Sequence, residues 1–573
     1  MKFVCKLLAA LLLWLFIACN DTEKGRAEAE KAADSGATAN MMITPEETTD
    51  AAAVAPPPTV KMYKFTPPKI VKDGEVIEGA PAPEALEDVK IREEEKPFNT
   101  EDYDRIVENR FLAATQNPLS TFSIDVDEAA YSNVRRYINN GSIPPAGAVR
   151  IEEMINYFDY AYPQPTNEDP FSVNTELSEC PWNAQHRLVH IGLQGKEIPL
   201  QNLPNANIVF LIDVSGSMEE PNKLPLVKAS MNLLADQLRA DDKVAIVVYA
   251  GNAGLVLPAT SGANKIAVKE AIDQLQAGGS TAGGEGIQLA YKVARENFIK
   301  GGNNRIILAT DGDFNVGASS DDELVSMIEK ERKSGIFLSV LGYGMGNYKD
   351  NKMQQLADKG NGNHSYIDNI NEARKVLVSE FGSTLFTIAK DVKLQIEFNP
   401  AKVQAYRLIG YENRVLAAED FNDDKKDAGE LGSGHTVTAL YEVIPAGVKS
   451  EFITKVDDLK YQPVKNSNPV TSGGDELMTI KLRYKKPDGD VSKLIVHPVT
   501  DAHIALANTS DNFRFSAAVA SFGMLLRNSE FKQNASFQQV ISLAKSAKGT
   551  DANGYRQEFI NLVQAAGSLT AKK

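Results

Sequence analysis

Cysteine is scarce in this sequence, because 573 residues contain only three: Cys5, Cys19 and Cys180. Cys5 and Cys19 fall in an N-terminal secretory signal, which leaves Cys180 without a partner. A framework of disulfides is therefore excluded, and the stability of the fold has to come from packing. We expect Cys180 to be a small, buried apolar side chain.

Basic residues are fewer than acidic ones, 61 Lys and Arg against 76 Asp and Glu, and the formal net charge is −15. A protein that binds the phosphates of nucleic acid needs a basic face, so nucleic acid is excluded as a partner. The six histidines form no His-Glu-x-x-His motif. The length is too great for one hydrophobic core and predicts about three domains.

The apolar run near the N-terminus, residues 7–17, is too short to span a bilayer. It follows a basic start and precedes Ala18 and Cys19, so residues 1–19 are typical of a secretory signal. Residues 15–19 resemble a bacterial lipobox, with Phe16 where a small aliphatic residue is usual. The resemblance implies that Cys19 is lipidated and that the protein is anchored in the bacterial cell envelope. We expect the outer membrane, on its periplasmic or surface face. The alternative is a soluble secreted protein with Cys19 near the cleavage site by chance.

Residues 20–115 are expected to form a disordered tether. Their composition, above all up to Pro97, is rich in Ala, Glu, Thr and Pro. Such a segment cannot bury enough apolar surface to offset its loss of conformational entropy. Where proline is dense the tether would be semi-extended, and it would hold the folded part away from a membrane.

The most informative segment is an apolar strand pattern, residues 207–212, that ends in Asp213-Val214-Ser215-Gly216-Ser217. Apolar residues without alternation predict a strand that is covered on both faces. Ligands of open α/β sheets bind beyond the carboxyl ends of such strands. Asp213, Ser215 and Ser217 supply only oxygen, which suits Mg²⁺ better than zinc. Taken alone, the triplet could also be an ordinary polar turn.

Two later segments add oxygen donors at comparable positions. Residues 278–287 form a Gly-rich loop in which Thr281 can present its hydroxyl, although Ser280 or Thr281 could equally cap a helix. Residues 305–310 repeat the buried-strand pattern and end at Asp311, for which the alternative is a turn made by the Asp311-Gly312 pair.

Together the three segments resemble the von Willebrand factor type A domain and its metal-ion-dependent adhesion site. The resemblance implies that Ser215, Ser217 and Thr281 offer hydroxyls to the ion. Asp213 and Asp311 would stand in its inner or outer coordination shell. The ion would be Mg²⁺, or Mn²⁺ or Ca²⁺. Helical and strand patterns alternate through residues 205–385, which predicts an α/β fold: a doubly wound, mostly parallel, Rossmann-like sheet.

The flanking segments are expected to contain a sandwich-like β-rich unit and C-terminal helices. Residues 116–200 predict an N-terminal α+β unit, residues 390–500 a β-rich unit, and residues 505–570 a helical segment. Our hypothesis is that strands from both flanks pair into one β-sandwich with the type A segment inserted. Asp125 and Asp127 could be a catalytic pair, or simply a solvated strand end before a helix. This order of units resembles bacterial cell-envelope lipoproteins of the YfbK type.

The sequence therefore predicts a membrane-anchored protein that binds another protein through a divalent cation. The ion would accept an Asp or Glu carboxylate from the partner, and the loops at residues 218–224 and 313–322 would set specificity. We expect no enzymatic activity, because no Ser/His/Asp arrangement, Cys/His pair or phosphate loop stands near the site. Two alternatives stay open: an envelope-assembly scaffold whose ion is purely structural, and a metal-dependent hydrolase.

Overall fold

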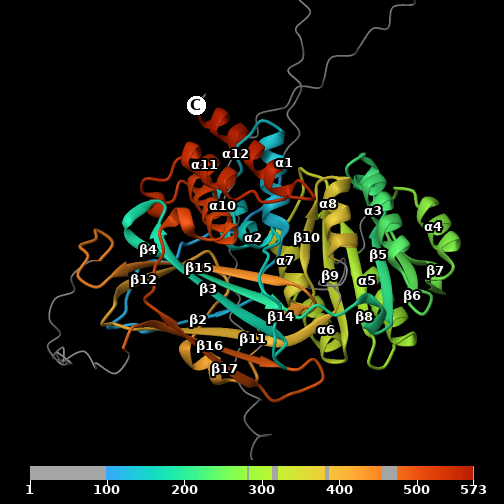
Figure 1. Cartoon of the computed structure of the whole chain (residues 1–573). Helices are drawn as coiled ribbons and strands as arrows, with labels where there is room; N and C mark the ends of the chain where they lie inside the picture. Colours follow the sequence, from blue (N-terminus) through green and yellow to red (C-terminus); the bar gives the residue numbers. More distant parts are fainter. Residues whose placement is uncertain are drawn as a thin grey trace, which may run out of the picture. The chain divides into compact units, whose positions relative to one another are not determined.

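Three β-sheets form the framework of the computed structural model (Figure 1). The structure describes residues 99–280, 283–312, 321–380, 386–426, 428–453 and 474–571. The expected signal, Cys19, the tether up to residue 98, Thr281 and most of the loop at 313–322 lie outside these ranges. None of the helices within them is both long and apolar enough to cross a membrane.

The first sheet belongs to the α/β segment and has the strand order β10-β9-β8-β5-β6-β7. All neighbouring strands are parallel except β7, which runs antiparallel to β6 at the edge. The strands are β5 (Ala206–Asp213), β6 (Lys243–Tyr249), β7 (Ala253–Ser261), β8 (Asn303–Thr310), β9 (Ile336–Tyr343) and β10 (His364–Ile367).

Helices cover both faces of this sheet, which explains why its strands are apolar without alternation. In β5, Phe210 packs into the core on one face and Leu211 into the core on the other. The first face is covered by α3 (Leu224–Gln237), α4 (Lys265–Asp273), α8 (Ile370–Arg374) and a π-helical turn, Lys375–Ser379. The second is covered by α5 (Gly283–Glu296), α6 (Asp321–Lys333) and α7 (Asp350–Lys359). The predicted doubly wound α/β fold is confirmed.

The other two sheets are antiparallel and face each other. One has the order β1-β12-β15-β4-β3, and the other β13-β2-β11-β16-β17 with β14 paired to β11. The strands of the first are β1 (Leu112–Ala113), β12 (Val403–Ile409), β15 (Thr436–Pro445), β4 (Asn183–Gly195) and β3 (Phe171–Cys180). Those of the second are β13 (Val415–Leu416), β2 (Leu119–Ser123), β11 (Thr387–Phe398), β14 (Gly429–Gly432), β16 (Glu476–Lys485) and β17 (Lys493–Thr500).

Each of these sheets combines strands from both sides of the α/β segment. Phe122 of β2 pairs with Leu394 of β11, and Ile191 of β4 pairs with Ala439 of β15. Apolar side chains from both sheets form one core between them. This is the single β-sandwich with an inserted α/β segment that our hypothesis expects. Residues 116–200 and 390–500 therefore contribute to one sandwich instead of forming separate units.

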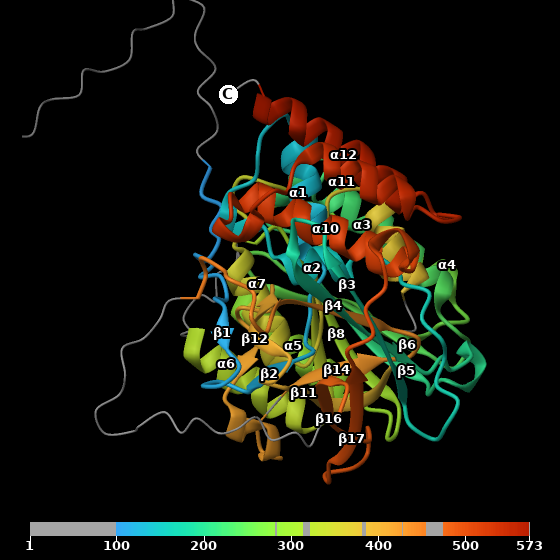
Figure 2. The same cartoon turned by 60° about the vertical axis from the view of Figure 1, so that its left-hand side comes forward.

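A layer of helices covers the outer face of the five-stranded sheet (Figure 2). It contains α1 (Ala129–Asn139) and α2 (Ile151–Asn156) from the N-terminal flank. The C-terminal flank adds α10 (Asp511–Arg527), α11 (Phe537–Ser546) and α12 (Tyr555–Ala571). The Ser510 hydroxyl accepts the Phe513 N–H and so caps α10. Cys180 is a free, buried thiol within this core, as predicted.

Buried ion pairs join the α/β segment to the rest of the fold. Arg135 of α1 contacts Asp368 and, at 2.7 Å, Glu372. The Asp127 carboxylate accepts the backbone N–H of His364 at 2.8 Å and pairs with Arg414 at 3.1 Å. Asp127 is 2 % exposed, so the alternative of a solvated strand end is wrong for this residue. It is a buried acid whose partners come from other elements.

Candidate metal centre

Four of the five predicted oxygen donors lie at the carboxyl ends of two adjacent parallel strands. Asp213 is the last residue of β5, and Asp311 directly follows β8. A short 3₁₀ helix, Gly216–Glu219, begins after Ser215 and turns the chain over the end of the sheet. The pattern of a buried strand followed by polar residues therefore places Asp213, Ser215, Ser217 and Asp311 on one edge.

Asp213 is fully buried, and hydrogen bonds fix the orientation of its carboxylate. Oδ1 accepts the backbone N–H of Ser215 at 2.9 Å. Oδ2 accepts the hydroxyls of Tyr249 at 3.1 Å and Thr310 at 3.2 Å. Burial raises the pKa of Asp213 to about 6, and the charge of Asp311 acts in the same direction. A bound cation would stabilise the ionised form of both acids.

The two serine hydroxyls are spaced as neighbouring ligands of a small cation would be. Oγ of Ser215 and Oγ of Ser217 lie 3.1 Å apart. In an octahedral Mg²⁺ site with bonds of about 2.1 Å, adjacent ligands are about 3.0 Å apart. Ser215 is buried and Ser217 is exposed, so the pair leads from the interior to solvent. The donors present fit a hard divalent cation.

Asp311 is held by two side chains that the sequence did not indicate. Its Oδ2 accepts hydrogen bonds from Lys223 Nζ at 3.1 Å and from Asn347 Nδ2 at 3.0 Å. Gly312 has a φ of +98°, and a Cβ there would lie 2.7 Å from the Lys349 nitrogen. The backbone bends at the Asp311-Gly312 pair, and this bend places the Asp311 carboxylate at the site.

The Gly-rich loop lies beside the serine segment. The Gly216 N–H donates to the Gly279 carbonyl at 3.0 Å, and the Gly278 N–H donates to the Val214 carbonyl at 2.7 Å. Gly279 has a φ of +85°, which glycine adopts without strain. These contacts bring the loop to the edge where the other donors lie. Thr281 is outside the described residues, so its role stays a prediction.

A shallow cavity of about 430 Å³ opens over this edge of the sheet. Ser217, Lys223 and Asn347 contribute to its wall, and so does Thr100 from the first described segment of the chain. The Thr100 N–H donates to the Gly346 carbonyl at 2.7 Å. The chain therefore enters the fold at the rim of the candidate centre. The predicted end of the tether at residue 115 is wrong, because residues 99–115 are part of the fold and include strand β1.

Glu101 anchors the first described residues of the chain to the rest of the fold. Its carboxylate is 3 % exposed and accepts from two nitrogens of Arg136, from the hydroxyls of Tyr103 and Tyr137, and from the Gly346 N–H at 2.8 Å. Burial alone would raise the pKa of Glu101, but Arg136 and the other donors lower it to about 2. Sequence patterns gave no sign of this contact, because its partners are separated from it by up to 245 residues.

The arrangement is suited to holding a cation with hydroxyl and carboxylate oxygens. Within the described ranges, no group of three or more His, Cys, Asp or Glu side chains could hold a metal ion. A cation here would therefore depend on the serine hydroxyls as well as on Asp213 and Asp311.

Family models match the sequence in three successive stretches. Residues 97–190 match a model described as von Willebrand factor, and residues 207–378 match the von Willebrand factor type A domain. Residues 383–569 match the C-terminal region of the uncharacterized protein YfbK.

Two relatives in sequence are a YfbK protein and a UPF0353 protein. The uncharacterized protein YfbK of Escherichia coli K12 is 46 % identical over 475 residues, which are 82 % of this chain and 81 % of that protein. A UPF0353 protein of Mycolicibacterium paratuberculosis is 33 % identical over 154 residues, 25 % of this chain and 45 % of that protein.

A solved structure of a von Willebrand factor type A protein from Catenulispora acidiphila is 16 % identical. The match covers 70 % of this chain and 92 % of that one, with a TM-score of 0.37. The match to YfbK spans both the inserted α/β segment and the sandwich that surrounds it. The chain therefore belongs to the YfbK family and contains a von Willebrand factor type A domain.

Proposed function

We propose that this protein binds another protein through a divalent cation held at the candidate metal centre. The observation that carries the proposal is the Ser215–Ser217 hydroxyl pair, 3.1 Å apart, beside the buried Asp213 and at the foot of an open cavity. Thr281 would add a third hydroxyl. Mg²⁺ is the ion that the oxygen donors favour, with Mn²⁺ or Ca²⁺ as substitutes.

The donor set explains why such a centre would attract an acid. Serine hydroxyls are neutral, and Lys223 already offsets the charge of Asp311. A divalent cation held there would keep part of its positive charge, and it would supply a Lewis-acidic position for an Asp or Glu carboxylate of the partner. Tyr249 and Thr310 would hold the Asp213 carboxylate in place while the partner's carboxylate binds to the cation.

The residues around the cavity favour binding over hydrolysis. Glu219, Glu220 and the exposed Met345 line it, and none of them is a nucleophile beside a general base. We therefore propose a role without enzymatic activity. The Lys223–Asp311 pair also argues against a purely structural ion, because it stabilises Asp311 without a metal.

The cellular placement is part of the same proposal. A lipidated Cys19 would anchor the protein in the bacterial cell envelope, at the outer membrane, and the following segment would act as the tether. The entry of the chain at Thr100, beside the candidate centre, means that partner binding would take place close to the point where the tether joins the fold.

A capture experiment with envelope extracts tests the proposal. Full-length wild type and Ser217→Ala are immobilised, and proteins retained with Mg²⁺ and with EDTA are compared. Ser334→Ala, which removes an exposed hydroxyl that bonds only the local Glu331 carbonyl, is the matched control. We expect Mg²⁺-dependent capture by wild type and Ser334→Ala, with loss in Ser217→Ala. Equal capture in EDTA would refute the role of the cation.

A further inference from the structure

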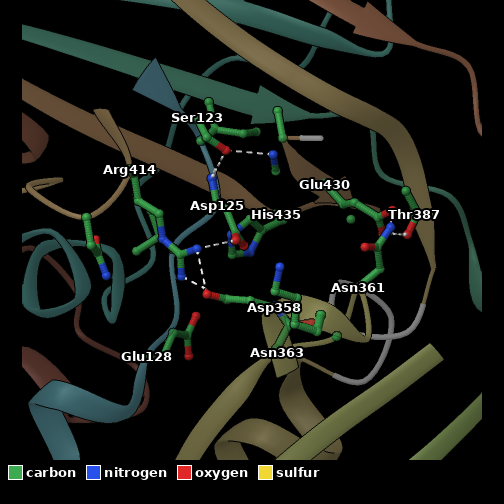
Figure 3. A pocket seen from close by; sticks show the side chains of 18 of the residues that line it. Ser123, Asp125, Glu128, Asp358, Asn361, Asn363, Thr387, Arg414, Glu430 and His435 are labelled. Carbon is green, nitrogen blue, oxygen red and sulfur yellow. Dashed lines mark hydrogen bonds and ion pairs between the residues drawn. The ribbon is translucent and has the colours of Figure 1, made fainter. Parts of the chain in front are cut away.

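A second cavity lies at the opposite end of the α/β sheet, between that sheet and the β-sandwich. Its volume is about 400 Å³. Figure 3 shows Arg414 next to Asp125 and Asp358 on one side, and Asn361 next to Glu430 and Thr387 on the other. Its described lining is mainly polar, and it includes residues from β2, β8, β11, β14 and the end of α7.

Arg305 is the lining residue whose charge is least compensated. It is 1 % exposed, and its guanidinium donates one hydrogen bond, from Nη1 to the Ser339 hydroxyl at 2.7 Å. Its Nε has no hydrogen-bond partner. The charge of Glu430 acts on Arg305, but the Glu430 carboxylate accepts its hydrogen bonds from Asn361 and Thr387. A buried guanidinium with unused donors is unfavourable unless another group supplies acceptors.

The position of Arg305 on its strand explains why it meets the cavity. Ile307 and Ala309, two and four residues further along β8, point to the core beneath α3 and α8. Arg305 shares that face at the amino end of the strand, as does Ser339 on β9. Ser365 of the neighbouring strand β10 lines the cavity too. Instead of an apolar core, this end of the face presents polar groups to the cavity.

The rest of the lining is acidic. Besides Arg305 it contains six carboxylates and three cationic side chains. The carboxylates belong to Asp125, Glu128, Glu329, Asp358, Glu380 and Glu430. Arg414 holds Asp125 at 2.7 Å and Asp358 at 3.0 Å, yet both acids keep more than a quarter of their side chains exposed. A purely anionic ligand would meet repulsion here, whereas an amino group would meet carboxylate oxygens.

We propose that this cavity binds a small zwitterion of the amino-acid type. Its carboxylate pairs with the unused donors of Arg305, and its amino group lies against the acidic side chains Asp125 and Asp358. The paired Arg–carboxylate geometry supplies orientation as well as affinity. Burial lowers the pKa of Arg305 to about 10, which accords with a guanidinium that gains stability from an added anion.

This site is independent of the candidate metal centre. Arg305 is the third residue of β8, whereas Asp311 follows the last one. The two sites are therefore at opposite ends of the same strand, and either could be present without the other.

Calorimetry on the full-length protein tests the proposal. Glycine, L-alanine, L-glutamate and L-lysine are the probes, with acetate and methylammonium as probes that carry one charge each. We expect at least one amino acid to bind at least roughly tenfold more tightly than either single-charge probe. Binding of acetate as tight as that of every amino acid would overturn the zwitterion assignment. Failure of all four amino acids to bind would overturn it as well.

Two variants test whether the amino acid binds at Arg305. Arg305→Met should weaken amino-acid binding by roughly tenfold or more, because it removes charged hydrogen bonds. Arg295→Met, which changes an arginine of α5 paired with Glu331 outside this cavity, is the matched control and should bind as wild type does. Unchanged binding in a folded Arg305→Met would refute the site. If Arg305→Met does not fold, hydrogen exchange of the wild type decides. The amino acid should slow exchange at residues 361–363 and 428–432, and unchanged exchange there would refute the site.

Discussion

The ammonium of Lys223 lies 3.1 Å from Oδ2 of Asp311, at the centre where we propose that a divalent cation binds. Both side chains are at least 95 % buried. The methylenes of Lys223 pass over Gly344, where a Cβ would lie 2.5 Å from Cε of the lysine. The fold therefore places a lysine beside one of the proposed acidic ligands.

Removal of that charge should strengthen metal binding. In Lys223→Met, Asp311 loses a competing cation, and we expect Mg²⁺ affinity to rise by roughly tenfold, about 1.4 kcal/mol. The metal-free variant should be less stable by roughly 1–3 kcal/mol, because a buried carboxylate loses a charged donor. Calorimetric Mg²⁺ titration and urea unfolding in EDTA measure the two effects. Lys228→Met, which changes a lysine of α3 that bonds only to backbone carbonyls, should change neither by much.

The Glu101 contact should stabilise the fold in a pH-dependent way. Glu101→Gln leaves Arg136 without its carboxylate, and we expect a loss of roughly 1–3 kcal/mol in the free energy of unfolding at pH 7. Because the folded pKa of about 2 is below the ordinary value of 4.5, this stabilisation is complete above pH 4.5 and disappears as the pH falls toward 2. Urea unfolding of both proteins at several pH values should show their stabilities converge in acid. A constant difference would contradict the assignment.

His190 should make the fold sensitive to mild acid. It is buried, its Nε2 is hydrogen-bonded to the Tyr162 hydroxyl at 2.9 Å, and burial lowers its pKa to about 3. Below pH 6.5 the unfolded chain binds a proton that the folded state does not, so stability decreases as the pH falls. Between pH 7 and pH 5 this amounts to about 2 kcal/mol.

A substitution separates this effect from other titrations. His190→Gln removes the titrating group, so the stability difference between wild type and variant should shift by about 2 kcal/mol between pH 7 and pH 5. Guanidinium unfolding at both pH values gives that difference. A pH-independent difference would show that His190 is not buried in its neutral form.

Arg414 should be important for the junction between the α/β segment and the sandwich. It bonds Asp125, Asp127 and Asp358, so Arg414→Met leaves three carboxylates facing one another. We expect a loss of roughly 3–5 kcal/mol at pH 7. Burial, and then the charge of Asp358, already raise the pKa of Asp127. Protonation should therefore reduce the penalty at pH 5, which thermal unfolding at the two pH values can show.

The α/β segment could be predicted in detail because its strands are covered on both faces. Phe210 and Leu211 are adjacent and both buried, and this continuity distinguishes β5 from an alternating strand. The edge strand β7 was not predicted, because it is only half-covered and contains Gly254 and Pro258. The last described helical part of this segment is a short α-helix, Ile370–Arg374, followed by a π-helical turn, Lys375–Ser379.

The candidate centre could be predicted only in part. Asp213 and Asp311 could be recognised in the sequence because each is an acid at the end of an apolar strand pattern. Parallel pairing of β5 and β8 brings those ends together. Lys223 and Asn347 reach Asp311 from loops 88 and 36 residues away. Hydrophobic periodicity determines which face a side chain occupies, but it does not determine which loops meet. The role of Arg305 could not be predicted from the sequence either. A single polar residue at the start of an apolar run only marks where the strand begins.

The insertion of the α/β segment has a consequence for biosynthesis. β2 ends at Ser123, and the strand that pairs with it, β11, begins at Thr387. During translation, β2 leaves the ribosome before its partner strand β11 has been synthesised. The α/β segment between them can complete its own sheet first. Early formation of that nucleus would bring the two ends of the insertion near each other and shorten the loop that must close. The last helices to emerge then cover a face whose first strands were made several hundred codons earlier.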